Sequence, residues 1–106
     1  MRYFIRPSFL ILLWVAVSVQ AAQFGTDRFI EYRPGELPLV LTSPHGGSLT
    51  PAAIPDRKEG VTTKDMATQE LTLAISDALH AATGRRPHVI MSHLHRRKLD
   101  PNREIK

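Results

Sequence analysis

The 106-residue chain contains no cysteine. A disulfide framework is therefore excluded, and so are thiolate ligands for a metal ion. Any metal in this protein must be held by histidine, aspartate or glutamate side chains. The restriction matters because the amino terminus indicates export, and exported proteins commonly use disulfides.

Long apolar runs are also missing. The longest, Phe9 to Val19, is about a dozen residues long, whereas a membrane span needs roughly 20. Arg2 and Arg6 precede this run, and Val19-Gln20-Ala21 supplies small residues for cleavage, which is the pattern of a secretory signal peptide. We expect residues 1–21 to be removed and the mature protein to be periplasmic or secreted. An uncleaved amino-terminal membrane anchor is the alternative.

The mature chain has little excess charge of either sign. The whole sequence carries 14 lysines and arginines against 10 aspartates and glutamates, a net charge of +4. Without the two arginines of the leader, 12 basic residues face 10 acidic ones, a net charge of +2. The run Arg96-Arg97-Lys98 has no aromatic residues beside it on which bases could stack. We therefore expect no nucleic-acid partner, and no membrane partner after the leader is cleaved.

Apolar periodicity predicts a strand, a helix and a second strand. Leu37 to Thr42 is an apolar run that should end near Ser43, because Pro44 cannot donate to a sheet. The second strand is His88 to His93. Between them, residues 62–83 carry one apolar stripe at helical spacing, formed by Ala67, Leu71, Ala74, Ile75, Ala78, Leu79 and Ala82.

The remaining segments complete the expected fold. Phe29 to Tyr32 is a short edge strand, and residues 48–60 form a long surface loop. Thr62 and Asp65 make a weak capping box at the start of the helix, and Gly84 is placed to end it.

Strand, helix and strand then form a βαβ unit of a mostly parallel sheet, an α/β fold. One helix can cover only one face of such a sheet. Residues 22–106 are therefore expected to be the amino-terminal part of a larger α/β domain.

Two polar loops leave the carboxyl ends of the two main strands. His45 follows the first strand, and Gly46-Gly47 lets the backbone pass close to whatever the imidazole holds. Leu94 to Arg103 follows the second strand. Because parallel strands end at the same edge of a sheet, where ligands bind in open α/β folds, both loops should border one site. The alternatives are a packed histidine and a solvated basic tail.

Five blocks of the sequence carry a family resemblance. In chain order they are Ser43-Pro44-His45-Gly46-Gly47, Ile54-Pro55-Asp56-Arg57, Asp65 to Leu71, Gly84-Arg85-Arg86-Pro87-His88, and Leu94 to Arg103 with its Asp-x-Asn-Arg ending. On these blocks, which span almost all of the mature chain, the protein resembles the N-formylglutamate amidohydrolase family. The resemblance implies a three-layer α/β/α fold similar to that of the zinc carboxypeptidases. It also implies metal-dependent cleavage of the amide between an acyl group and an acidic amino acid.

The resemblance also implies roles for individual residues. His45 is the expected first ligand of a zinc ion or similar divalent metal, which would activate water for attack on the amide. Arg103 is expected to bind the substrate carboxylate through its two-pronged guanidinium group, and Asn102 to add a hydrogen bond. The catalytic acid or base and a further histidine ligand are not found among the 106 residues.

The second metal ligand is open between two acidic residues. Asp65 is preferred, since it should lie at the same sheet edge as His45, although it could instead only satisfy the helix start. Glu70 is the other candidate, and an ion pair with Arg96, Arg97 or Lys98 is its competing role. Glu70 and Arg97 could also orient the ligands without touching the metal. A protein that keeps only part of the site would be an inactive exported module that binds metal or anions, which is the alternative function.

Overall fold

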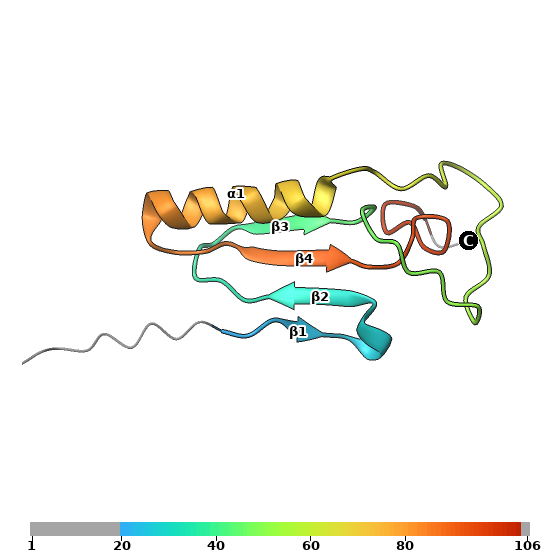
Figure 1. Cartoon of the computed structure of the whole chain (residues 1–106), viewed down its shortest axis with the longest axis horizontal. Coiled ribbons are helices and arrows are strands. Elements are labelled where there is room, and N and C mark those ends of the chain that lie inside the picture. The colour runs from blue at the N-terminus through green and yellow to red at the C-terminus, as the bar shows by residue number, and fades with distance from the viewer. Residues whose placement is uncertain (1–19, 105–106) are drawn as a thin grey trace, which may run out of the picture.

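The computed structural model describes residues 20–104 and shows an α/β fold with one mixed sheet and one helix (Figure 1). The strands are β1 (Gln23–Phe24), β2 (Ile30–Arg33), β3 (Val40–Ser43) and β4 (His88–Ser92), joined by the short 3-10 helix η1 (Thr26–Arg28) and by α1 (Thr68–Thr83). The sheet order is β1-β2-β4-β3. The predicted leader, residues 1–21, lies almost entirely outside the described residues. Within residues 20–104, no helix is long and apolar enough to cross a membrane.

The predicted βαβ unit is present. β3 and β4 pair in parallel, from Val40 opposite His88 to Ser43 opposite Met91, and α1 connects them. The expectation of a mostly parallel sheet is wrong for the described strands, because β2 pairs with β4 antiparallel and β1 with β2 antiparallel. β2 was expected at an edge, but the unpredicted strand β1 covers its outer side.

The helix begins later than predicted. Ala67 adopts a left-handed conformation, with φ of 57°, and α1 starts only at Thr68. The expected capping box at Thr62 and Asp65 is therefore wrong, and Asp65 lies in the loop before the helix. The other end is as predicted, because Gly84 is left-handed and its N–H donates to the His80 carbonyl at 2.8 Å.

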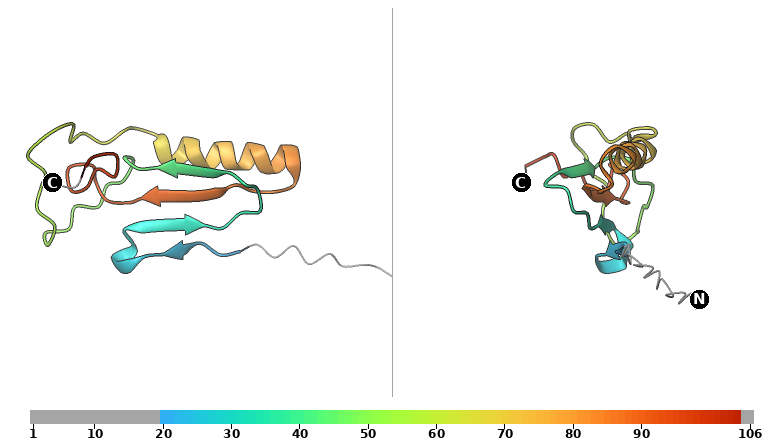
Figure 2. Two further views of the ribbon diagram at one scale, coloured as in Figure 1. Left: turned by 180° about the vertical axis from the view of Figure 1, so that it is seen from behind. Right: turned by 90° about the vertical axis from the view of Figure 1, so that its left-hand side faces the viewer.

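The apolar stripe of α1 does not face the sheet. The helix residues buried against the sheet are Thr72 and Ser76, whereas Leu71 and Ile75 are 60% and 42% exposed. Figure 2 shows α1 on one side of the sheet. In the described part of the chain nothing covers the opposite face, which exposes Ile30, Val40 and Ile90. The core that remains is small and consists of Val89, Met91 and Leu94.

Candidate functional site

The loops that follow β3 and β4 lie against each other. The Leu49 N–H donates to the His93 carbonyl at 2.8 Å, and an isolated parallel bridge joins Leu49 to Leu94. Gly47 permits this approach, since a Cβ at that position would overlap the backbone of His93. Both loops therefore meet at one edge of the sheet, as the sequence predicted, at the right-hand end of Figure 1.

His45 is held between two carboxylates. Its Nε2 lies 2.7 Å from Asp100 Oδ1, and its Nδ1 lies 3.2 Å from Asp65 Oδ2. The Asp65 N–H also donates to the His45 carbonyl at 3.0 Å, which fixes the two residues side by side although 20 positions separate them. An imidazole can donate to both carboxylates only in its protonated form. In the neutral form, one of the two ring nitrogens presents a lone pair to its carboxylate, and a cation between them would remove that repulsion.

Arg96 ties the two carboxylates together. Its Nε donates to Asp100 Oδ2 at 3.1 Å, and its Nη1 donates to Asp65 Oδ1 at 3.3 Å. Arg57 and Arg103 also lie close to Asp100 Oδ2, at 3.8 and 3.7 Å. Three guanidinium groups therefore face two carboxylates, which leaves excess positive charge at the site before His45 is considered.

Asp100 is the buried centre of this cluster, with a fully buried side chain. Burial by itself would raise the pKa of the Asp100 carboxyl. Hydrogen bonds from His45, from the Asn102 backbone N–H and from Arg96 outweigh burial and hold this pKa well below its usual range. Asp100 is therefore ionised at neutral pH and supplies a permanent negative charge behind His45.

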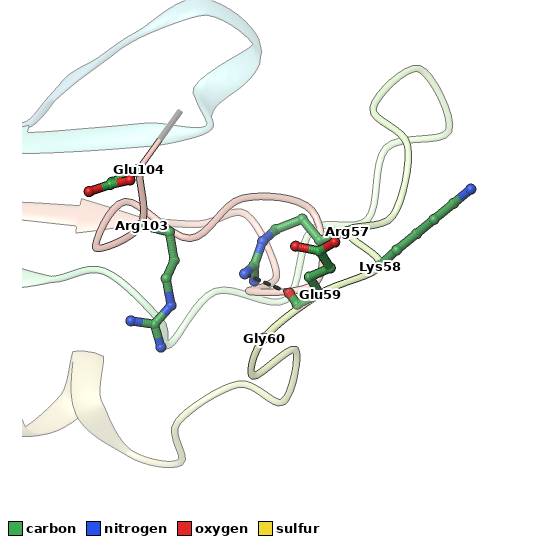
Figure 3. Close-up of a pocket in the computed structure, with 6 residues that line it drawn as sticks. All are labelled: Arg57, Lys58, Glu59, Gly60, Arg103 and Glu104. Carbon is green, nitrogen blue, oxygen red and sulfur yellow. Dashed lines mark hydrogen bonds between the residues drawn. The ribbon is translucent and has the colours of Figure 1, made fainter. Parts of the chain in front are cut away.

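A cavity of about 620 Å³ opens beside the cluster (Figure 3). It is lined by Arg57, Lys58, Glu59, Gly60, Arg103 and Glu104. Arg57 is fixed by donation to the carbonyls of Val61, Arg96 and Glu59. Arg103 is about half exposed and projects into the open space, while Lys58 extends away from both arginines. The lining thus carries three basic side chains against two acidic ones, a small positive excess, and its two arginines suit an anionic ligand.

Of the two predicted substrate-binding residues, Arg103 lines the cavity and Asn102 does not. Arg103 lines the cavity, as a carboxylate-binding residue would. Asn102 contributes its backbone, because its N–H donates to Asp100 Oδ1 at 3.0 Å, and the residue itself is exposed.

The two residues expected to support the ligands lie away from His45. Glu70 is exposed on α1 and makes no ion pair with Arg96, Arg97 or Lys98. Arg97 lies 3.8 Å from Asp56, so its neighbour Arg96 has the supporting position instead.

Sequence reasoning gave Asp100, Arg96 and Arg57 no role at the site, although all three lie in the blocks that carry the resemblance. A signal for Asp100 was present, since Asp-Pro-Asn is typical of a turn in which the aspartate accepts a hydrogen bond from the N–H two residues later. The structure shows this bond. The choice of Arg96 over Arg97 depends on the turn at Arg96 to Lys98, where Lys98 N–H bonds to His95, and periodicity does not predict it.

Two other histidines of β4 and its loop are hydrogen-bonded away from the cluster. His88 Nδ1 lies 2.8 Å from the Tyr32 hydroxyl, and the two rings stack. His93 Nε2 lies 2.8 Å from the buried Glu31. Neither ring faces the cluster around His45.

The described residues do not assemble a complete metal site. No group of three or more histidine, aspartate or glutamate side chains in residues 20–104 is arranged to hold a metal ion. His45 Nδ1 and Asp65 Oδ2 do fit as two neighbouring ligands, because ligands at zinc distances of 2.0–2.1 Å in a tetrahedron are about 3.3 Å apart and these atoms are 3.2 Å apart. Asp100 on the other ring nitrogen is the usual orienting partner of a metal-bound histidine.

Comparisons with protein-family models, with curated proteins and with solved structures give no match. The resemblance to the N-formylglutamate amidohydrolase family therefore stays a prediction from the sequence blocks.

Proposed function

We propose that this chain provides part of the active site of a metal-dependent amidohydrolase, which cleaves the amide bond of N-acylated acidic amino acids such as N-formylglutamate. The observation that carries the proposal is His45, fixed between Asp65 and Asp100 next to an arginine-lined cavity. A metal-ligand pair and a carboxylate-binding surface are the two parts that such a reaction needs side by side. The sequence blocks of the family resemblance supply the same two loops.

The residues that would hold a zinc ion, or another divalent metal, are His45 through Nδ1 and Asp65 through Oδ2. A bound metal would polarise the amide carbonyl and lower the pKa of a bound water to about 7. The ionised Asp100 can only accept, so it favours the tautomer of His45 with the proton on Nε2, which would leave the Nδ1 lone pair for a metal. Catalytic zinc usually has three protein ligands, and the third is not among the described residues.

The arginines give the site its preference for an anionic substrate. Arg103 projects into the cavity and can take a carboxylate in two parallel hydrogen bonds. Arg57 borders the same cavity and is already rigid, which lowers the entropy lost on binding. A neutral acyl amino acid would lack the charge that these groups compensate, so acidic substrates are favoured.

The fold proposed for the complete domain is the three-layer arrangement of the zinc carboxypeptidases. The parallel β3–α1–β4 unit supports one half of it. The exposed apolar face of the sheet, with Ile30, Val40 and Ile90, supports a further helical layer on the other side. The mature protein is proposed to act after export, in the periplasm or outside the cell.

An exported module that binds metal or anions without hydrolysis is the second candidate. Two observations favour the binding module. The described residues supply two metal ligands, one fewer than a catalytic zinc usually has, and the arginines near Asp100 give the site excess positive charge. The two candidates share the binding residues and differ only in turnover.

Hydrolysis of N-formyl-L-glutamate by a purified, zinc-supplemented protein that contains the complete domain tests the proposal, with formate release as the readout and N-formyl-L-leucine as the neutral control substrate. We expect formate from the glutamate derivative alone and none from His45→Ala. Arg103→Ala should raise KM about fivefold, or ~1 kcal/mol, because the half-exposed guanidinium is screened by water. Zinc binding without formate release would support the binding module, and equal hydrolysis of both substrates would contradict the role of the arginines.

A further inference from the structure

Four side chains around His45 form a closed ring of contacts. His45 Nδ1 lies 3.2 Å from Asp65 Oδ2, and the other oxygen of Asp65 accepts from Arg96 Nη1 at 3.3 Å. Arg96 Nε donates to Asp100 Oδ2 at 3.1 Å, and Asp100 Oδ1 lies 2.7 Å from His45 Nε2. Both carboxylates thus turn one oxygen toward His45 and the other toward Arg96. All four residues belong to the described chain, so the ring is complete without a further strand or helix of the domain.

Asp65 is the least firmly held member of this ring in the described chain. Its backbone N–H donates to the His45 carbonyl at 3.0 Å, but its side chain is 46% exposed and lies in the loop before α1. The partners of its carboxylate are His45 and Arg96. Asp100, by contrast, is fully buried, and Arg96 is 11% exposed with its carbonyl accepting from Arg57 Nη1. The rotation of the Asp65 carboxylate therefore depends on its two neighbours in the ring.

A bound metal would remove one of these two contacts. His45 Nδ1 and Asp65 Oδ2 are the proposed ligand atoms, so a metal would take the place of the direct contact between them. The hydrogen bond from Arg96 goes to the other oxygen, Oδ1, and does not compete with the metal. Arg96 would then be the side chain that still fixes how Asp65 is turned. Because Oδ1 is engaged, Asp65 would offer the metal a single oxygen.

We propose that Arg96 is a positioning residue for the metal ligands: it holds Asp65 by Oδ1 and presents Oδ2 alone to the metal. This inference rests on the metal site of the proposed function. Asp100 then aligns both ligands from one buried position, because it contacts His45 directly and holds Asp65 through Arg96. Partners of this kind set the orientation of metal ligands, and their removal usually lowers metal affinity about 10–100-fold.

The charge of Arg96 acts in the opposite direction from its position. A guanidinium group beside a bound cation repels it, so removal of the charge alone would strengthen zinc binding. Arg96→Lys separates the two effects, because lysine keeps the charge but has one nitrogen in place of Nε and Nη1, which bond to different carboxylates. We expect that nitrogen to stay with Asp100, since an unpaired buried charge costs more than an exposed one, and to leave Asp65 unheld.

Zinc affinity in Arg96→Lys tests the proposal, measured by competition with a chromophoric chelator on a purified protein that contains the complete domain. We expect the dissociation constant to rise about tenfold or more, with the circular dichroism spectrum of wild type retained. Arg97→Lys is the matched control, because the guanidinium of Arg97 lies near Asp56 and away from the ring. Its zinc affinity should be that of wild type. Unchanged affinity in Arg96→Lys, or tighter zinc binding in Arg96→Gln, would overturn the proposal.

Cobalt(II) in place of zinc gives a second readout, one that a merely structural role of Arg96 would not change. The visible spectrum of bound cobalt depends on the number and geometry of its ligands. Without the bond from Arg96 to Oδ1, both oxygens of Asp65 can reach the metal. We therefore expect cobalt-saturated Arg96→Lys to differ in spectrum from wild type and from Arg97→Lys. Identical spectra in all three proteins would overturn the single-oxygen role of Asp65.

These measurements separate the role of Arg96 from the proposed function. Zinc that binds to wild type, is lost in His45→Ala and binds equally well to Arg96→Lys would overturn the role of Arg96 and leave the metal site standing. A wild-type protein that binds no zinc would overturn both. Zinc binding that depends on Arg96, in a protein that releases no formate, would support the role of Arg96 and contradict hydrolysis alone.

Discussion

Replacing Asp100 by asparagine should be among the most damaging isosteric changes in the described chain. Asp100 Oδ1 accepts hydrogen bonds from His45 and from the Asn102 N–H, and Oδ2 accepts from Arg96. The amide oxygen of an asparagine could replace Oδ1 and keep the hydrogen bonds from His45 and the Asn102 N–H. Its amide NH₂ would then take the place of Oδ2 and face Arg96, Arg57 and Arg103, which are all donors.

The magnitude follows from those contacts. One hydrogen bond to a charged group is worth about 1.5–3 kcal/mol, and breaking a buried ion pair costs about 3–5 kcal/mol. Arg96 is largely buried but Arg103 is half exposed, so the lower part of this range applies. We expect Asp100→Asn to lower the free energy of unfolding by about 3 kcal/mol and Tm by roughly 12–24 °C, at 4–8 °C per kcal/mol for a small domain.

The loss should also depend on pH in a defined direction. The pKa of Asp100 is lower in the folded protein than its ordinary value of 3.8, so its ionised form stabilises the fold. That contribution is complete above the ordinary pKa and is lost progressively as the pH falls below about 4. The difference between wild type and Asp100→Asn should therefore be constant from neutral pH down to about 5 and shrink at lower pH.

Urea unfolding followed by circular dichroism, at pH 7 and in steps down to pH 3, measures both effects. Asp56→Asn is the matched control, because Asp56 also forms ion pairs, with Lys98 and Arg97, but is exposed. Its effect should be small. A loss below about 1 kcal/mol for Asp100→Asn, or a difference that persists unchanged at pH 3, would refute the assignment of Asp100 as the buried anionic centre.

Two further predictions concern the backbone that positions the site. Gly47→Ala should destabilise the fold by about 3 kcal/mol, because the new Cβ would overlap the His93 backbone; Gly25→Ala, where the nearest atoms are 3.9 Å away, should be nearly neutral in the same thermal melts. Ala67→Gly should raise the free energy of unfolding by about 0.5–1 kcal/mol, since it relieves a left-handed alanine at the start of α1. Unchanged or lower stability in Ala67→Gly would show that the helix start is not strained.

The sequence predicted the elements that depend on local pattern. The apolar run before Pro44, the parallel unit around α1, the glycine that ends the helix and the meeting of the two loops all appear in the structure. Each follows from periodicity, from proline and glycine chemistry or from the geometry of parallel strands.

What could not be predicted depends on contacts between distant residues. Asp65 is held outside the helix by the His45 carbonyl, a bond across 20 positions, so capping chemistry alone placed the helix start too early. The stripe with Leu71 and Ile75 indicated a helix correctly but not which side of it meets the sheet. The side of α1 that is buried carries the small polar residues Thr72 and Ser76.

The central claim is that His45 and Asp65 hold a metal ion, and equilibrium zinc binding tests it most directly. The purified protein should be dialysed against a zinc buffer and its bound metal measured by atomic absorption, in wild type, His45→Ala and Arg103→Ala. We predict zinc bound to the wild type and to Arg103→Ala and little bound to His45→Ala, because a ligand lost from so small a set is not replaced. Equal zinc in His45→Ala and wild type would contradict the claim and leave His45 as a structural histidine between two carboxylates.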